Sequence, residues 1–240
     1  MQLFYSKDIA PSGFCTLDAE ESRHAVRVLR LREGDTIHVT DGAGHLYTCR
    51  IVQAGSGECV VESVSLLSTV DHQLPSLHLA VAPTKNPSRM EWLVEKAVEI
   101  GVGEITLLQC DHSERTFLKT DRLEKLAVSA MKQSLHTVLP QINPPVKLTD
   151  WLTSHFSPLA SHLKFIAHCE ADQPRTPLAA ALQPGRDAVV LIGPEGDFSA
   201  EEIALALDSG FQPVSLGPSR LRTETAALYA VTAFNLINDK

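Results

Sequence analysis

Two glycine-proline turns in the C-terminal half of the chain are the stretches best suited to hold a ligand. Gly193-Pro194-Glu195-Gly196 follows the apolar run "AVVLI", and Gly217-Pro218 follows "PVSL". Glycine lets the backbone approach a ligand closely and adopt positive φ angles, and proline stiffens the turn. A plain strand-to-helix connection needs little more than one glycine, so the first turn favours a ligand-binding loop over that alternative.

The ligand predicted for these turns is neutral or cationic. Glu195 and Asp197 are both acidic, and two carboxylates would repel a phosphate group. The chain also has no G-x-G-x-x-G fingerprint and no glycine-lysine-serine/threonine of a phosphate-binding loop.

Arg222 is placed unusually, directly before the helix expected to begin at Thr223. The positive end of a helix dipole disfavours a cation there. An arginine at this position is either paired with a carboxylate such as Glu224 or available to a ligand. The alanines within 226–230 leave a second choice open, because small residues allow packing either inside the chain or against another chain.

A short segment near the N-terminus is strongly basic although the whole chain has a net charge of −8. The stretch "SRHAVRVLRLR" at 22–32 contains no acidic residue, and its arginines are Arg23, Arg27, Arg30 and Arg32. One interpretation is a solvated helix face paired with Glu20, Glu21 and Glu33. The other is a local site for nucleic-acid phosphates.

Composition is typical of a globular cytoplasmic protein of one or two domains. The 240 residues are 44% hydrophobic and 21% charged, with no apolar run long enough to span a membrane and no signal-peptide pattern at the start. The five cysteines are scattered without a C-x-x-C motif, which favours reduced thiols over disulfides or zinc ligands. His155, His162 and His168 lie near one another in sequence but do not have metal-site spacing, so no metal is expected.

The first seventy residues read mainly as short strands. Residues 36–55 alternate and turn at 41–44, which predicts a hairpin, and residues 58–67 predict another strand. Only 19–31 has a helical pattern. We therefore expect a compact β-barrel-like domain over 1–70, followed by a polar linker at 68–76.

Beyond the linker, strands alternate with helices. Strands are expected at 77–83, 104–110, 164–169, 188–193 and 213–217, and helices at 88–100, 121–139, 199–209 and 223–237. Ser88 with Glu91 and Ser199 with Glu202 have the spacing of capping boxes. Repeated β-α-β units imply an α/β domain over 76–240, with a parallel sheet covered on both faces.

Two long motifs resemble those of the RsmE group of SPOUT methyltransferases. They are "LIGPEGDFSAEE" at 191–202 and "LGPSRLRTETAA" at 216–227. The pieces "LFYS", "VLRLREGD", "MEWLVEKAVEIGV", "SER" at 113–115 and Gln133-Ser134 are also similar, so the resemblance covers nearly the whole chain.

The resemblance implies an N-terminal PUA-like barrel and a C-terminal SPOUT domain with a trefoil knot. It also implies a homodimer with the cofactor pocket at the subunit interface. The implied activity is methylation of N3 of a uridine in 16S ribosomal RNA of the small subunit, with S-adenosylmethionine as the methyl donor.

The resemblance assigns cofactor binding to the segments 169–171, 191–196 and 216–223. The residues expected to bind S-adenosylmethionine are Cys169, Leu191, Gly193, Pro194, Glu195, Gly196, Leu216, Gly217, Leu221 and Thr223. Arg222 is the expected catalytic residue, because a cation beside the uracil carbonyls would stabilise the anion that develops at N3. The residues expected to bind RNA are Arg23, Arg27, Arg30, Arg32, Lys85, Arg89 and Gln133.

Two positions depart from the family pattern. The family commonly has arginine where this chain has Ser219, and Arg220 is the nearest replacement. Gln133-Ser134 is followed in the family by glycine-arginine, but here by Leu135-His136. The second departure concerns the RNA contacts of that helix more than the cofactor site.

Overall fold

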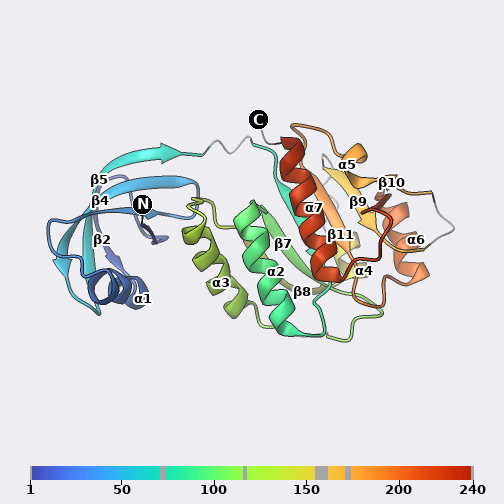
Figure 1. Cartoon of the computed structure of the whole chain (residues 1–240), viewed down its shortest axis with the longest axis horizontal. Helices are drawn as coiled ribbons and strands as arrows, with labels where there is room; N and C mark the ends of the chain where they lie inside the picture. Colours follow the sequence, from blue (N-terminus) through green and yellow to red (C-terminus); the bar gives the residue numbers. More distant parts are fainter. Residues whose placement is uncertain (1, 71–73, 116–117, 155–161, 171–173, 239–240) are drawn as a thin grey trace. The chain divides into compact units, whose positions relative to one another are not determined.

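The computed structural model describes residues 2–70, 74–115, 118–154, 162–170 and 174–238. They belong to two compact units (Figure 1). The N-terminal unit consists of residues 1–73 together with 128–139, and the C-terminal unit consists of 74–127 together with 140–240. Helix α3 (Thr120–Gln133) therefore begins in one unit and ends in the other.

The N-terminal unit is built on a five-stranded sheet in the order β1-β3-β4-β5-β2. Its strands are β1 (Leu3–Tyr5), β2 (Gly13–Leu17), β3 (Thr36–Thr40), β4 (His45–Ala54) and β5 (Cys59–Thr69). The predicted hairpin is confirmed, since β3 and β4 pair antiparallel across the turn at 41–44. Alternate residues of these strands, such as Ile37 and Val39, are buried in the core of this unit.

The helix predicted over 19–31 is confirmed over 19–28, but its second part is π-helical and it ends three residues early. Asp18 caps the α-helix α1 (Ala19–Arg23) by accepting hydrogen bonds from two backbone N–H groups. A π-helical turn, η1 (His24–Val28), follows at once, and Arg30 adopts a positive φ of 58°. The apolar spacing that suggested one helix therefore runs through a π turn and a left-handed residue, which end the α-helix at Arg23.

Residues 128–139 pack on this unit through both side chain and backbone. Lys132 forms an ion pair with the buried Glu21. The Thr40 hydroxyl donates to the Thr137 carbonyl at 3.0 Å, and Val138 forms a bridge with Ala43 in the hairpin turn. The prediction of one helix over 121–139 is thus too long, because α3 ends at Gln133 and the next residues follow the hairpin.

The C-terminal unit contains a seven-stranded sheet in the order β10-β12-β9-β11-β6-β7-β8. All its neighbouring strands are parallel, which confirms the predicted α/β class. The strands are β6 (Leu77–Val81), β7 (Glu104–Gln109), β8 (Gln141–Lys147), β9 (Leu163–Ala167), β10 (Thr176–Pro177), β11 (Ala188–Ile192) and β12 (Gln212–Ser215). Strands β8 and β10, and the helices α4 (Leu148–Ser154) and α5 (Leu178–Ala181), were not predicted.

Helices cover both faces of this sheet. Helices α2 (Pro87–Ile100) and α7 (Thr223–Asn238) lie side by side on one face, as Figure 1 shows, and α7 contacts β6 and β11. Helices α4 and α6 (Ala200–Asp208) contact each other, and their apolar side chains pack with Val189 and Leu191. Every residue of the central strands β6 and β11 is buried, as a sheet covered on both faces requires.

One of the two predicted N-terminal capping boxes is present, and the other is not. The capping box of Ser199 and Glu202 at the start of α6 is confirmed. The box predicted at Ser88 is wrong, because Asn86 caps α2 and Pro87 occupies its first turn. The alanines within 226–230 follow the internal alternative, since Ala227 and Ala230 are fully buried inside the chain.

Candidate active site

The candidate site lies where three neighbouring strands of the C-terminal unit end. Strand β9 lies between β11 and β12, so the segments that follow these three parallel strands meet at one edge of the sheet. This is the edge at which open α/β sheets bind ligands. The two glycine-proline turns therefore lie near each other, as the sequence predicts.

Two cavities with shared walls occupy this edge. The larger has a volume of about 670 Å³ and is lined by residues of the segments 192–203 and 220–226 together with Cys169 and Glu170. The smaller has a volume of about 240 Å³ and is lined by residues of 167–169 and 214–221 with Arg175. They share Ala167, Cys169, Arg220, Leu221 and Ala226. A pair of adjoining cavities can hold a ligand with two parts, and the larger one is within the roughly 300–1,000 Å³ of small-molecule sites.

A hydrogen bond from the first residue of α7 fixes the turn that follows β11. The Thr223 hydroxyl donates to the Gly193 carbonyl at 3.1 Å, which links the two predicted loops directly. Gly193 has no room for a side chain, because a Cβ there would lie 3.1 Å from the Phe198 ring. Glycine at 193 thus serves packing within the turn.

Asp197 joins this turn to the segment after β9, a role beyond the acidic charge that the sequence indicated for it. Its carboxylate accepts hydrogen bonds from the backbone N–H groups of Cys169 at 2.7 Å and Phe198 at 2.9 Å. Asp197 also has a φ of 64°, and its own N–H donates to the Pro194 carbonyl at 3.0 Å. An aspartate after a glycine turn is the sequence signal that could have identified it, since Asp tolerates this conformation and bonds nearby backbone.

The segments after β6 and β7 hold the same turn from the other side. The backbone N–H of Lys85 donates to the Glu195 carboxylate at 3.0 Å. The Nδ1 atom of His112 lies 3.1 Å from the carbonyl oxygens of both Gly196 and Asp197, so it donates to them. A Cβ on Gly196 would lie 3.0 Å from the His112 side chain. His112 is a residue that no sequence motif indicated.

Of the two alternatives for Arg222, pairing with Glu224 is not what the structure has. Glu224 forms an ion pair with Arg89, with 3.6 Å between Oε1 and Nε. Arg222 is exposed and lines the larger cavity, and it forms no ion pair with any described residue. Its guanidinium group is therefore available to a ligand.

Nine of the ten predicted cofactor residues line one or both of the cavities. Gly193, Pro194, Glu195, Gly196 and Thr223 line the larger cavity, Leu216 and Gly217 line the smaller one, and Cys169 and Leu221 line both. Leu191 lines neither, because its side chain is fully buried in the core with Trp151. Ala171, at the end of the first predicted segment, lies outside the described residues.

His168 forms part of the wall of the smaller cavity and is 4% exposed. Burial lowers the pKa of its imidazole, an effect to which Arg175 adds and which Asp197 opposes. The Arg175 guanidinium donates to the backbone carbonyl of His168. At neutral pH the ring is therefore uncharged.

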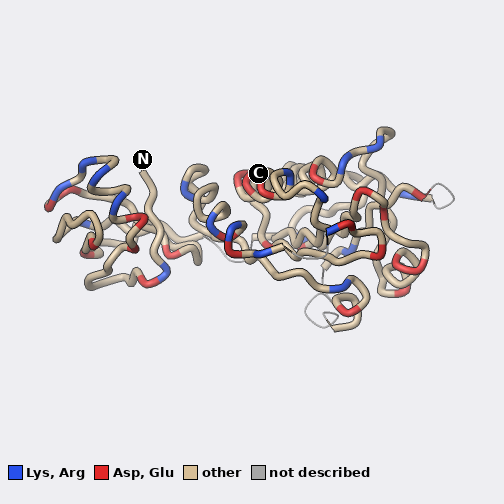
Figure 2. The backbone as a smooth tube through the Cα atoms, turned by 90° about the horizontal axis from the view of Figure 1, so that it is seen from below, with Lys and Arg blue, Asp and Glu red and all other residues tan. Residues whose placement is uncertain are grey.

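The predicted RNA-binding arginines of the N-terminal unit are exposed and form no ion pair with described residues. Arg27 donates to the Ser56 hydroxyl at 3.2 Å, and Arg30 and Arg32 line an open cavity of about 520 Å³. Gln133 is exposed at the end of α3. Figure 2 shows that acidic and basic residues occur along both units, so the net negative charge does not exclude local basic segments.

The two predicted RNA-binding residues of the C-terminal unit have partners within the chain. The Lys85 ammonium lies 2.6 Å from the Glu114 carboxylate, and Arg89 pairs with Glu224. Both lysine and arginine keep exposed surface, 70% and 38% of the side chain respectively. RNA would have to share these side chains with their carboxylates.

The five cysteines are all free, and they differ in exposure. Cys169 is the exposed thiol, and the other four cysteines are buried and free. Desolvation raises the pKa of Cys49 to about 12. Among the described residues there is no cluster of three or more metal-ligating side chains, and His155 lies outside them. No described helix is both long and apolar enough to cross a membrane.

Family models match most of the chain. One described as an RNA methyltransferase domain matches residues 72–235, and one described as an RNA methyltransferase PUA domain matches residues 17–62. The chain belongs to this RNA methyltransferase family. The predicted fold class is thereby confirmed as a PUA-like domain followed by an α/β methyltransferase domain.

Relatives within the family agree with the predicted resemblance to the RsmE group. Ribosomal RNA small subunit methyltransferase E of a Synechocystis strain is 30% identical, with 92% of this chain and 73% of that protein covered. The crystal structure of a probable rRNA-methyltransferase from Porphyromonas gingivalis is 39% identical, covers 99% of this chain and 98% of that one, and has a TM-score of 0.90.

A relative with a bound ligand covers the whole chain. Ribosomal RNA small subunit methyltransferase E from Neisseria gonorrhoeae, solved bound to S-adenosyl methionine, is 26% identical. It covers 99% of this chain and 98% of its own, with a TM-score of 0.82.

Proposed function

We propose that this chain transfers the methyl group of S-adenosylmethionine to N3 of a uridine in 16S ribosomal RNA of the small subunit. The observation that carries the proposal is the pair of adjoining cavities at the ends of β9, β11 and β12, with the unpaired Arg222 in the wall of the larger one. The names of the relatives support the choice of methyl donor and RNA.

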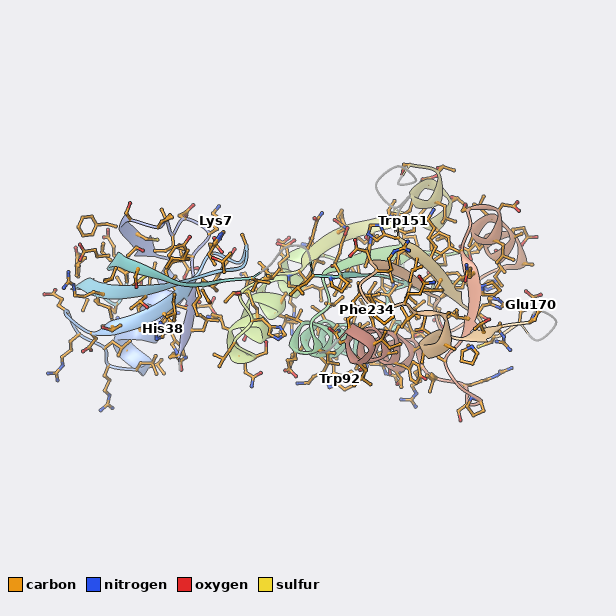
Figure 3. All side chains as sticks on the ribbon, turned by 90° about the horizontal axis from the view of Figure 1, so that it is seen from above. Lys7, His38, Trp92, Trp151, Glu170 and Phe234 are labelled. Carbon is orange, nitrogen blue, oxygen red and sulfur yellow. The ribbon has the colours of Figure 1, made fainter. Side chains whose placement is uncertain are left out.

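The residues around the cavities fit the methyl donor. Ala167, Leu221 and Ala226 form apolar walls between the two cavities, which suits a heteroaromatic ring. Glu170, Glu195 and Asp197 supply carboxylates to the larger cavity, which suits a cationic ligand. Figure 3 labels Glu170 at this end of the unit. When bound, S-adenosylmethionine supplies a methyl group that is already electrophilic because its sulfur is positively charged.

The protein must therefore supply position and charge rather than activation of the methyl group. The Thr223–Gly193 hydrogen bond and the Asp197 carboxylate hold the cavity walls in place without a ligand. Uridine N3 must lose a proton during the reaction, which leaves negative charge shared with the uracil carbonyl oxygens. Arg222 would stabilise that charge, and its role as the catalytic residue follows from its exposure at the cavity and its freedom from carboxylates.

RNA is held by basic residues of both units in this proposal. Arg23, Arg27, Arg30 and Arg32 are exposed without acidic partners, so they can bind phosphates at little cost. Lys85, Arg89 and Gln133 complete the proposed RNA-binding set. Because N3 is on the Watson–Crick edge of uracil, the target base must be unpaired or flipped out when it reaches the site.

A homodimer is part of the same proposal. Helix α2 exposes Trp92 at 46%, and helix α7 exposes Tyr229 at 41% and Leu236 at 70%, whereas Phe234 of α7 points inward (Figure 3). Large apolar side chains on two neighbouring helices are typical of a surface that another chain covers. We also propose that the protein is cytoplasmic and that its two domains comprise residues 1–70 and 76–240. The C-terminal domain would contain the trefoil knot that the family resemblance implies.

The decisive experiment compares ribosomal RNA from cells with and without this protein. Mass spectrometry of 16S fragments should show one 3-methyluridine that disappears on deletion and returns when the purified protein and S-adenosylmethionine are added. Calorimetry with S-adenosylmethionine and with ATP tests the competing ideas. Binding of RNA without either ligand would indicate a non-catalytic RNA-binding factor, and binding of ATP alone would indicate a different nucleotide enzyme.

A further inference from the structure

The hydrogen position on the His168 ring is set by its surroundings. His168 directly follows β9, and the backbone N–H of Glu170 donates to its Nδ1 atom at 3.3 Å. An Nδ1 that accepts a hydrogen bond has no hydrogen of its own. Because burial also keeps the ring neutral, its single ring hydrogen is on Nε2.

This Nε2–H is a buried donor with nothing to donate to. The atom is buried and has no hydrogen-bond partner among the residues that the structure describes. Buried polar groups are nearly always paired, and an unpaired donor costs roughly 1–3 kcal/mol of stability. Since His168 lines the smaller cavity, a ligand atom in that cavity is the natural acceptor.

The rest of the smaller cavity defines the kind of ligand that brings this acceptor. Its volume of about 240 Å³ and its apolar walls, from Ala167, Val214, Leu216, Leu221 and Ala226, suit a flat heteroaromatic ring. Three of these walls also face the larger cavity, so such a ring would be one end of a longer ligand. A ring that occupies this cavity beside His168 needs an unprotonated ring nitrogen at its edge.

We propose that His168 donates a hydrogen bond from Nε2 to a ring nitrogen of the purine of S-adenosylmethionine and so selects the base of the methyl donor. This inference rests on the proposed function, because it takes the methyl donor as the ligand. Adenine offers three such nitrogens, N1, N3 and N7. His168 is then a specificity-determining residue for the cofactor that no glycine-proline motif indicates.

The experiment measures binding of S-adenosylhomocysteine, and of its 1-deaza, 3-deaza and 7-deaza forms, by calorimetry. His168→Leu should weaken binding of S-adenosylhomocysteine at least about tenfold, and His168→Gln, which keeps a donor, should weaken it less. One deaza form should bind the unaltered protein at least about tenfold more weakly. That same deaza form should bind His168→Leu as tightly as it binds the unaltered protein, because the missing nitrogen and the substitution remove the same hydrogen bond.

Two further measurements distinguish ligand binding by His168 from a purely structural role. His168→Leu removes the unpaired donor together with the hydrogen bond that Nδ1 accepts from Glu170, so the thermal midpoint of the ligand-free protein should change by only a few degrees and binding is measured on folded protein. His162→Leu is the matched control, because His162 directly precedes β9, also has an unpartnered buried ring nitrogen, and lines neither cavity. Its affinity for S-adenosylhomocysteine should match that of the unaltered protein.

Two results would overturn the proposal. One is equal affinity of the unaltered protein and His168→Leu for S-adenosylhomocysteine. The other is an additive loss with every deaza form. Failure of the unaltered protein to bind S-adenosylhomocysteine would instead reject the proposed function, and this inference with it.

Discussion

Arg89 on α2 and Glu224 in the first turn of α7 form an ion pair, with Nε and Oε1 separated by 3.6 Å. The pair joins two helices that lie side by side on one face of the sheet. It also occupies the carboxylate nearest in sequence to Arg222, which leaves that arginine exposed at the larger cavity. One intramolecular contact thus explains how a cation at a helix start can remain available to a substrate.

Removal of Arg89 should destabilise the protein noticeably. The Glu224 side chain is only 8% exposed, so Arg89→Ala leaves a buried carboxylate unpaired, at a cost of about 1–3 kcal/mol in the free energy of unfolding. Urea denaturation measures this change. Arg122→Ala is the control, because the Arg122 side chain is 74% exposed in its pair with Glu91, and its loss should cost under about 1 kcal/mol. Equal effects of the two substitutions would contradict the importance of burial.

Arg222→Ala should reduce kcat by roughly 10²–10³-fold, since it removes one charge that stabilises the transition state. Affinity for S-adenosylhomocysteine, measured by calorimetry, should remain nearly unchanged. Arg220→Ala is the useful comparison, because Arg220 lines both cavities and should affect cofactor binding more than kcat. An Arg222→Ala protein with normal methylation would reject the catalytic role.

Gly217→Ala should lower both stability and cofactor affinity. Gly217 has a φ of 109°, a conformation that costs a residue with a side chain about 1–3 kcal/mol, although nothing would contact the new Cβ. Gly185 has a φ of 75° and an equally open Cβ position, but it lines neither cavity. Gly185→Ala should therefore lower the thermal midpoint while binding of S-adenosylhomocysteine stays normal. Loss of binding in both variants would point to general destabilisation.

A maleimide should react quickly with Cys169 and slowly with the other cysteines. Cys169 is exposed in the walls of both cavities, whereas the remaining thiols are buried, and the pKa of Cys49 is raised to about 12. Mass spectrometry of the labelled protein identifies the site, and Cys169→Ser should abolish the fast phase. S-adenosylhomocysteine should protect Cys169. Undiminished labelling of a saturated protein would place the ligand elsewhere.

His168 should make the protein less stable in mild acid. Burial lowers the pKa of its imidazole below the ordinary value of 6.5, so the unfolded chain takes up this proton at a higher pH than the folded chain does. The stabilisation is complete above pH 6.5 and is lost as the pH falls from there toward the folded-state pKa. His168→Gln should show a smaller decline in unfolding free energy from pH 7 to pH 5. A steeper decline than in the unaltered protein would contradict the sign of the shift.

The sequence predicts which loops meet where a motif has a fixed place on a parallel sheet. Gly193 and Gly217 follow buried strands, so their loops had to emerge at the same edge, and the Thr223–Gly193 hydrogen bond joins those loops. The bridging roles of Asp197 and His112 escaped prediction for a physical reason. Their roles depend on which loops become neighbours in space, and His112 is more than eighty residues from the carbonyls it contacts.

Elements with conflicting local signals were predicted less well. Strand β8 contains Pro144-Pro145, and proline is a poor strand former, yet β8 is an edge strand where a missing N–H is tolerated. The segment 19–31 has helical spacing, but that spacing does not distinguish the α-helix at 19–23 from the π turn at 24–28. Leu191, which the family resemblance assigns to cofactor binding, has its side chain in the core.

The N-terminal unit is discontinuous in sequence, because twelve residues from the middle of the chain complete it. Any exchange of this unit between related enzymes by recombination would therefore have to transplant two separate gene segments. A swap of the first seventy codons alone would replace Glu21 and leave Lys132 beside a foreign residue. Evolution of RNA specificity in this protein is for that reason expected to proceed by substitutions within both segments rather than by replacement of a cassette.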